Sequence, residues 1–78
     1  MGRKSYKYDK ILCKNFGSKV FVLRKDNGLT QADLAFEVGI STSYLSSIER
    51  GTTDSTISTA KRLAKALKTN MNELFIFK

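Results

Sequence analysis

The chain has 78 residues, of which 41% are apolar, and a formal net charge of +7. This length and composition fit one small globular domain. The composition excludes a disordered chain and the length excludes a two-domain protein. A membrane protein is excluded because no apolar run approaches the ~20 residues of a transmembrane helix. The chain has no histidine and one cysteine, Cys13, so we expect no disulfide, metal site, cofactor, small-molecule substrate or enzyme activity.

Positive charge is concentrated at the start of the sequence. Residues 1–25 hold eight of the 14 Lys and Arg residues and a single acid, Asp9. A basic stretch on a small domain favours nucleic acid as a partner, although a solvated face would have the same composition. Residues 1–8 are polar and basic, and we expect a flexible arm there, ahead of a domain over residues 9–78.

The first predicted helix starts after Asp9, a suitable N-cap, and ends at Asp26-Asn27-Gly28. Gly17 is expected to weaken its middle and to split or kink it. Its apolar residues recur at steps of three and four, as one helix face requires: Ile11, Leu12, Phe16, Val20 and Leu23.

Two short helices are predicted on either side of Gly39, which suits a turn in the left-handed conformation. Thr30 would cap the first helix and Ser41 the second. The negative charge of Asp33 would interact favourably with the positive N-terminal end of the first helix dipole. The second helix ends at Gly51. The inner faces of the two helices are formed by Leu34, Ala35, Val38, Leu45 and Ile48.

A loop over residues 52–55 leads to a fourth predicted helix, which is capped by Thr56 and runs through Leu67. A short fifth helix is expected after Asn70, and the apolar tail over residues 76–78 is expected to pack against the domain. No stretch alternates with period two for long enough to form a strand. The prediction is therefore an all-α fold of five helices with short connections.

The helices around Gly39 have the layout of a helix-turn-helix, in which one helix braces the next across a tight turn. This region resembles the phage repressor/Cro-like (XRE-type) DNA-binding family, and the resemblance extends over about residues 15–75. The matching segments are Gly28-Leu29-Thr30-Gln31, Leu34-Ala35, Val38-Gly39-Ile40-Ser41, Leu45-Ser46-Ser47-Ile48 and Glu49-Arg50-Gly51. Residues 43–51 also resemble the controller proteins of restriction–modification systems.

The resemblance implies a compact five-helix repressor-like domain, and a transcriptional regulator that binds double-stranded operator DNA with its third helix in the major groove. It further implies a bacterial or phage-encoded protein that acts in the cytoplasm, at the nucleoid. Base contacts would come from Thr42, Ser43, Ser46 and Ser47. Phosphate contacts would come from Gln31, Ser41, Tyr44, Arg50 and Thr52. Arg24 and Glu49 would form a structural ion pair.

The hydroxyl side chains on the third helix cannot form the bidentate contacts that discriminate best between bases. We therefore expect weak direct readout, supplemented by DNA shape and by water-bridged contacts. The basic arm contains Arg3, Lys4 and Lys7. It either makes a further contact with DNA or is only a soluble terminus. A solvated face is the favoured interpretation for the basic residues of the fourth helix: Lys61, Arg62, Lys65 and Lys68.

A homodimer is predicted, because one module of this size contacts a single half-site. The candidate dimer residues are Leu67, Leu74, Phe75, Ile76 and Phe77, which would otherwise close the core of the monomer. The alternative to a DNA-binding regulator is an antitoxin or protein-interaction module on the same scaffold. That alternative predicts an acidic or apolar outer face on the third helix, whereas the hydroxyl-rich face beside Arg50 favours DNA.

Overall fold

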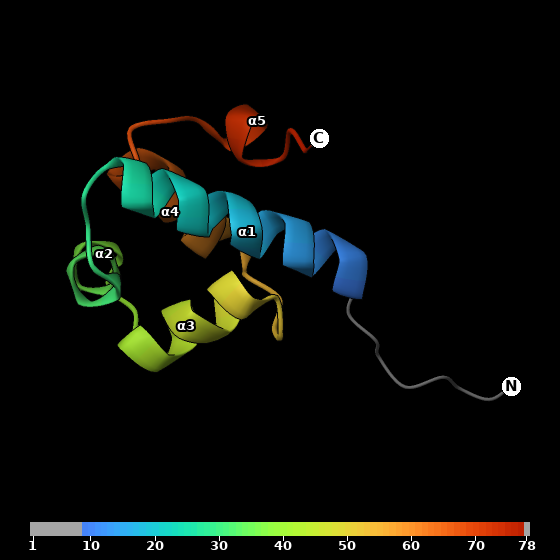
Figure 1. The fold of residues 1–78 in the computed structure, drawn as a ribbon, viewed down its shortest axis with the longest axis horizontal. Helices are drawn as coiled ribbons and strands as arrows, with labels where there is room; N and C mark the ends of the chain where they lie inside the picture. Colours follow the sequence, from blue (N-terminus) through green and yellow to red (C-terminus); the bar gives the residue numbers. More distant parts are fainter. Residues whose placement is uncertain (1–8, 78) are drawn as a thin grey trace, which may run out of the picture.

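The computed structural model describes residues 9–77, and in this region it contains five α-helices and no strand (Figure 1). The helices are α1 (Lys10–Asp26), α2 (Gln31–Val38), α3 (Thr42–Arg50), α4 (Ile57–Ala66) and α5 (Met71–Leu74). The predicted all-α, five-helix fold is thereby confirmed. No helix in the described part of the chain is long and apolar enough to cross a membrane. The predicted basic arm, with Arg3, Lys4 and Lys7, lies outside the described residues.

Every helix begins at a polar side chain that accepts a hydrogen bond from a backbone N–H three residues later, which satisfies one of the free donors of the first turn. The caps are Asp9, Thr30, Ser41, Thr56 and Asn70. At α2 the exchange is reciprocal, because the Asp33 carboxylate also accepts from the backbone N–H of Thr30 at 3.0 Å. That bond, and a second one in which the Thr30 side chain takes part, hold the pKa of Asp33 below its ordinary value.

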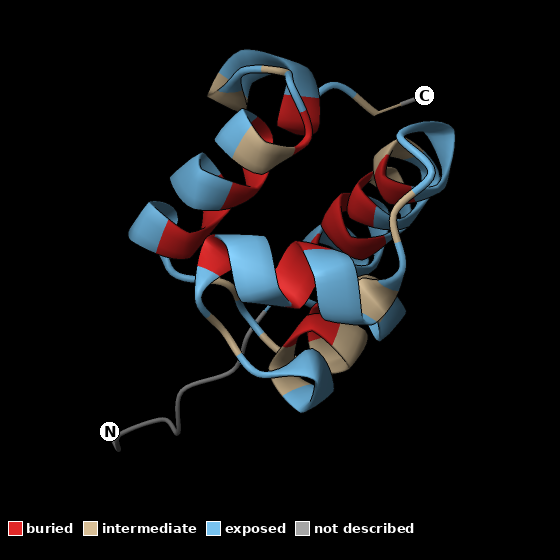
Figure 2. Cartoon of the chain, turned by 90° about the vertical axis from the view of Figure 1, so that its left-hand side faces the viewer, coloured by how far each residue is buried: buried red, intermediate tan, exposed pale blue. Residues whose placement is uncertain are grey.

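A single apolar core draws side chains from all five helices, whose inward faces are buried (Figure 2). The largest fully buried side chains are Val20, Leu34, Leu45, Ile48, Leu63 and Leu74. Helices as short as α2 and α3 are not stable alone in water. Their positions therefore depend on this shared core, which sets where the turn between them lies.

The helix α1 is a single element of 17 residues, so the expected split at Gly17 is wrong. Gly17 is buried, and a Cβ atom there would collide with the backbone carbonyl oxygens of Ile48 and Glu49 at the end of α3. A Cβ atom at Gly51, just after α3, would likewise collide with the backbone of Lys14. The glycine in α1 therefore serves a close helix contact, and its low helix propensity is offset by packing.

The segment after α5 folds back onto α1, as expected for the apolar tail (Figure 1). The ring of Phe75 stacks on Phe16 with centroids 5.1 Å apart, and Phe77 meets Phe75 edge-on at 6.3 Å. Lys19 Nζ donates a hydrogen bond of 3.1 Å to the carbonyl oxygen of Ile76 and lies 3.6 Å from the Glu73 carboxylate. These contacts fix the C-terminal segment beside the middle of α1.

Candidate nucleic-acid interface

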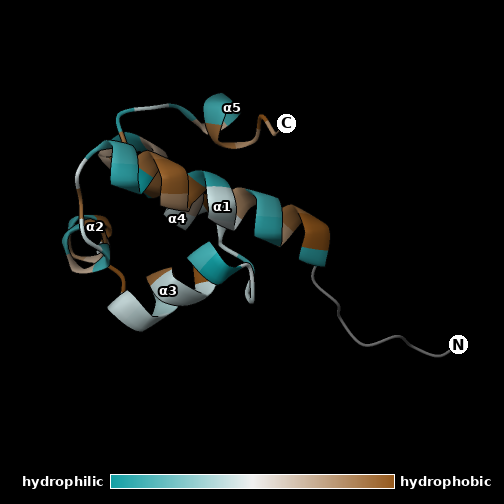
Figure 3. Cartoon of the chain, viewed as in Figure 1, coloured by the Kyte–Doolittle hydropathy of each residue, from teal (hydrophilic) through white to brown (hydrophobic). Residues whose placement is uncertain are grey.

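The helix α3 lies along one side of the molecule, and α5 lies across α1 from it (Figure 1). The inner residues of α3, Leu45 and Ile48, are buried in the core. Thr42 and Ser43 are exposed, whereas Ser46 and Ser47 are half-buried. By residue hydropathy, the ribbon of α3 is coloured mainly in the pale and hydrophilic shades (Figure 3). All four predicted base-contact residues thus lie on α3 with their hydroxyl groups outside the core.

The turn between α2 and α3 is formed by Gly39, whose φ of 83° is in the left-handed region. The backbone N–H groups of Gly39 and Ile40 both donate to the carbonyl oxygen of Ala35, at 2.8 and 3.0 Å. Ser41 then caps α3, because its Oγ accepts from the backbone N–H of Tyr44 at 3.0 Å. The hydroxyl oxygen of Ser41, expected at a phosphate, therefore also starts α3.

Arg24 and Glu49 form a buried ion pair that ties α1 to the end of α3. Arg24 Nε lies 2.7 Å from Glu49 Oε2 and Nη2 lies 3.1 Å from Oε1, and the two side chains are 8% and 3% exposed. Arg24 Nη1 donates to the carbonyl oxygen of Leu29 at 2.8 Å. Each nitrogen of this guanidinium thus donates within the protein, which gives Arg24 a structural role, as the resemblance implies.

Gln31, the first residue of α2, joins the same network. Its Nε2 atom donates to Glu49 Oε1 at 2.9 Å, and the side chain is half-buried. An amide nitrogen carries two N–H groups, so the bond to Glu49 leaves one donor on the same atom. The side chain expected at a phosphate is therefore already oriented by a carboxylate at the end of α3.

Two of the remaining predicted phosphate ligands, Arg50 and Thr52, lie at this same C-terminal end of α3, and the third, Tyr44, reaches the loop that follows. Thr52 Oγ1 donates to the carbonyl oxygen of Ser47 at 3.2 Å, and Tyr44 donates its phenolic O–H to the carbonyl oxygen of Asp54 at 3.3 Å. Arg50 is exposed, and its guanidinium lies back along α3. The single O–H donors of Tyr44 and Thr52 are thus already used within the protein, whereas the exposed guanidinium of Arg50 and the second N–H of Gln31 remain for contact with a DNA backbone.

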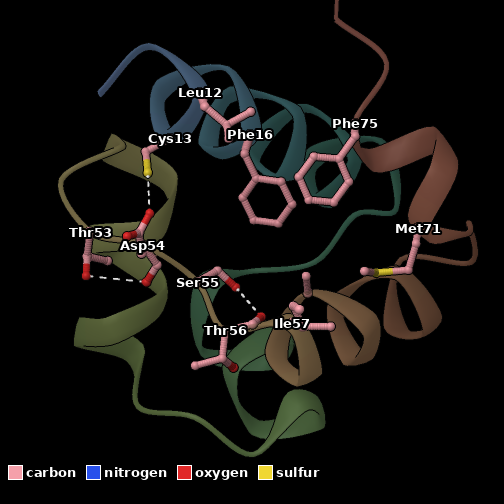
Figure 4. Close-up of a pocket in the computed structure, with 11 residues that line it drawn as sticks. Leu12, Cys13, Phe16, Thr53, Asp54, Ser55, Thr56, Ile57, Met71 and Phe75 are labelled. Carbon is pink, nitrogen blue, oxygen red and sulfur yellow. Dashed lines mark hydrogen bonds between the residues drawn. The ribbon is translucent and has the colours of Figure 1, made fainter. Parts of the chain in front are cut away.

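Asp54 is a residue of this region that the sequence did not single out. Its Oδ1 atom accepts a hydrogen bond from Cys13 Sγ at 3.0 Å (Figure 4). Burial, followed by that bond and the charge of Asp54, raises the pKa of Cys13 to about 11. Asp54 thus ties the loop after α3 to α1, and no local pattern in the sequence pairs these two residues.

The five candidate dimer residues differ in how far they are exposed on the single chain. Leu67 and Leu74 are 2% and 0% exposed within the single chain, so placing them on a dimer surface was wrong: they fill the core between α4, α5 and α1. Phe75 and Ile76 are 43% and 44% exposed, and Phe77 is half-buried.

A second apolar surface adjoins Phe75 and was not predicted. Leu12, Ile57 and Phe75 line a cavity of about 100 Å³ between α1, α4 and the loop after α3 (Figure 4). Ile57 is 80% exposed and Leu12 42%. The periodic apolar pattern could not reveal this surface, because Ile57 falls in register with residues that are buried.

A family model described as helix-turn-helix matches residues 22–74 of the chain. The chain belongs to the helix-turn-helix family. The matched region includes α2 to α5 and the end of α1, and the predicted resemblance to the repressor-like family is confirmed.

Three similar proteins place this helix-turn-helix chain among known ones. The uncharacterized HTH-type transcriptional regulator y4dJ of Sinorhizobium fredii (strain NBRC 101917 / NGR234) is 43% identical over 61 residues, which cover 78% of this chain and 79% of that protein. The restriction–modification controller protein C.AhdI from Aeromonas hydrophila has a TM-score of 0.78 and 36% identity, over 81% of this chain and 96% of that one. SinR, a master regulator for biofilm formation solved in complex with DNA, has a TM-score of 0.74 and 31% identity, over 78% and 98%.

Proposed function

We propose that this chain is a sequence-specific transcriptional regulator that inserts α3 into the major groove of double-stranded DNA. The observation that carries the proposal is the outer face of α3, where Thr42, Ser43, Ser46 and Ser47 present hydroxyl groups, with the Gln31 amide beside the C-terminal end of the helix. The relative that is named a transcriptional regulator and the similar SinR–DNA complex support it. An uncharged, hydrogen-bonding face suits base edges, which offer both donors and acceptors.

Phosphate contacts would hold α3 in register on the duplex. Gln31 and Ser41 stand at the N-termini of α2 and α3, where free backbone N–H groups and the helix dipole favour phosphate. Tyr44 and Thr52 would contact the backbone beside the loop after α3 by turning their single O–H donors from the carbonyl oxygens of Asp54 and Ser47 to phosphate. These contacts carry no sequence information, so discrimination depends on α3 together with DNA shape and bridging water.

We infer that the regulator binds as a homodimer, because a single helix-turn-helix contacts one half-site and two half-sites lie about one helical turn apart. The surface that we assign to the dimer consists of Leu12, Ile57, Phe75 and Ile76, all at least 42% exposed. Three of these residues line one cavity, so an apolar side chain from a second copy would find a concave apolar surface to fill. Grouped apolar residues of this size on a small domain favour cover by a partner.

The basic arm is proposed as an additional DNA contact. It contributes Arg3, Lys4 and Lys7, and basic arms can reach into a minor groove. Deletion of residues 2–8 is expected to weaken DNA binding and to flatten its dependence on salt concentration. Unchanged affinity in the deleted protein would rule out this contribution.

Selection from random duplex DNA, followed by gel shifts at two salt concentrations, tests the proposed function. We expect an enriched palindrome whose half-sites lie about one helical turn apart. Binding with a steep salt dependence but no enriched sequence would overturn sequence specificity and leave a DNA-backbone binder. No binding at moderate salt would overturn the whole proposal and favour an antitoxin or protein-interaction module on this scaffold.

A further inference from the structure

The outer face of α3 lacks a side chain of the kind that discriminates best between bases. Two parallel hydrogen bonds to a base edge require the planar side chain of Arg, Asn or Gln. Four short hydroxyl residues occupy the predicted base-contact positions: Thr42, Ser43, Ser46 and Ser47. Among the nine residues of α3 only Arg50 has a suitable side chain, which makes the position of its guanidinium decisive.

The guanidinium of Arg50 lies beside the base-contact residues. Arg50 Nη2 donates to Ser47 Oγ at 3.3 Å, and Nε donates to the carbonyl oxygen of Ser46 at 3.3 Å. Residues three apart share a helix face, and helical side chains lean toward the N-terminus. The charged end of Arg50 therefore extends back over the outer face of α3 and does not project beyond the helix end.

Nothing in the described part of the chain neutralises Arg50. The two ion pairs found there are Lys19–Glu73 and Arg24–Glu49, so the adjacent carboxylate of Glu49 is already taken by Arg24. The bonds from Arg50 to Ser46 and Ser47 are longer than the usual 2.9–3.0 Å of an N–H···O bond and go to neutral oxygens. They orient the guanidinium and use two of its five N–H donors, so the others remain for a stronger acceptor pair.

We propose that Arg50 reads a guanine, donating two parallel hydrogen bonds to O6 and N7 in the major groove, with the Ser47 hydroxyl positioning its guanidinium. The fork of Arg matches these two acceptors, and this pairing is the commonest specific contact to a base. The proposal rests on the proposed insertion of α3 into the major groove. It replaces the phosphate contact that the family resemblance implies for this residue.

A base contact and a phosphate contact at Arg50 predict different results for Arg50→Lys. Lysine keeps the charge but lacks the planar fork. A phosphate contact would therefore survive the substitution on every DNA sequence, whereas a guanine contact would be lost on the operator only. Arg62→Lys, an equally conservative change at an exposed site on α4, is the matched control.

The experiment measures the affinity of wild type, Arg50→Lys and Arg62→Lys for the operator selected by the wild type and for unrelated duplex DNA. For Arg50→Lys we expect about tenfold weaker binding to the operator and unchanged binding to unrelated DNA. Wild type should lose the same affinity when 7-deazaguanine, which lacks N7, replaces one guanine of each half-site. The affinity of Arg50→Lys should be the same for the modified and the unmodified operator. Arg62→Lys should behave as wild type.

Four outcomes would count against the proposal or its basis. If Arg50→Lys binds the operator as wild type does, or if Arg50→Ala weakens binding equally on all sequences with a flatter salt dependence, Arg50 contacts phosphate. If no single 7-deazaguanine weakens wild type, no N7 is read. If the wild type enriches no sequence, the proposed function itself fails, which is a separate result. Ser47→Ala should reduce the guanine preference of wild type and have no effect in Arg50→Lys.

Discussion

The backbone of Gly17 in α1 lies directly against the backbone carbonyl of Ile48 in α3. The approach is possible only because residue 17 has no side chain, and it places α1 and the proposed DNA-reading helix in backbone contact. Gly51, the C-cap of α3, lies in the same way against the backbone of Lys14, three residues before Gly17 in α1. These two contacts, together with the Arg24–Glu49 ion pair, set the position of α3 on the domain.

Gly17→Ala is expected to destabilise the domain by about 3 kcal/mol, because the new methyl group overlaps two carbonyl oxygens. Alanine would otherwise favour the helix by about 1 kcal/mol, so the sign of the change separates the two roles of the residue. Gly28→Ala is the control: its φ of +69° is strained for alanine, but nothing lies within 4 Å, and we expect a loss of about 1 kcal/mol. Urea unfolding measures both, and a Gly17→Ala protein as stable as wild type would refute the packing argument.

Arg24→Met is expected to cost about 3–5 kcal/mol of unfolding free energy, because it leaves the carboxylate of Glu49 buried without its partner. The double variant with Glu49→Met should be less destabilised than the sum of the two single changes. Lys19→Met provides the control, since the Lys19–Glu73 pair is 3.6 Å long and its side chains are 24% and 48% exposed. Loss of the Lys19–Glu73 pair should lower the free energy of unfolding by less than about 1 kcal/mol. Equal losses in Arg24→Met and Lys19→Met would show that burial adds nothing.

The features that sequence could predict are those with a local signature. All five helix starts follow from a cap residue three positions before the N–H that it satisfies. The turn at Gly39 follows from the left-handed backbone that it needs. The pairing of Arg24 with Glu49 came from the family resemblance, because the two residues are 25 positions apart and no spacing rule joins them.

The features that the sequence analysis missed depend on how elements distant in the sequence pack against one another. Gly17 has the same low helix propensity whether it bends a helix or lets another helix approach, so only the neighbour at Ile48 reveals its role. Leu74 and Phe75 are equally apolar, yet one is buried and the other 43% exposed. The direction of the Arg50 side chain and the bond between Cys13 and Asp54 are likewise set by packing across the fold.

Cys13 is expected to react slowly with alkylating reagents in the folded protein. Its pKa is raised to about 11 from the ordinary value of 9.0, so at pH 8 the thiolate is roughly a hundredfold rarer than in an unfolded chain. Iodoacetamide labelling followed by mass spectrometry, with and without urea, measures the difference. Comparable labelling rates in the two conditions would show that the thiol is neither buried nor held by Asp54.

The same shift predicts how stability depends on pH. Between pH 9 and about 11 the folded chain keeps a proton on Cys13 that the unfolded chain releases, so the free energy of unfolding falls as pH rises through this window. Below pH 9 the contribution is fully present. The stability difference between wild type and Cys13→Ala should therefore shrink from pH 8 to pH 11, and a constant difference would contradict the assignment.

Ile57→Lys is expected to weaken self-association without unfolding the monomer. Ile57 is 80% exposed at the rim of the cavity that Leu12 and Phe75 also line, so lysine there costs little in one chain but places charge in an apolar interface. Loss of one buried isoleucine from each copy should raise the dimer dissociation constant at least about tenfold. Phe36→Lys is the matched control, because Phe36 is 88% exposed on α2 and does not line that cavity.

Sedimentation over a range of concentrations measures the effect of Ile57→Lys on assembly. Wild type and Phe36→Lys should form dimers, and Ile57→Lys should sediment as the 8.8 kDa monomer at concentrations where they are paired. On DNA, Ile57→Lys should lose affinity for a two-half-site operator and keep its affinity for an isolated half-site, since α3 is unchanged. If Ile57→Lys and Phe36→Lys associate equally, the dimer surface lies elsewhere; if wild type is itself monomeric when it binds a palindrome, the two modules pair only on DNA.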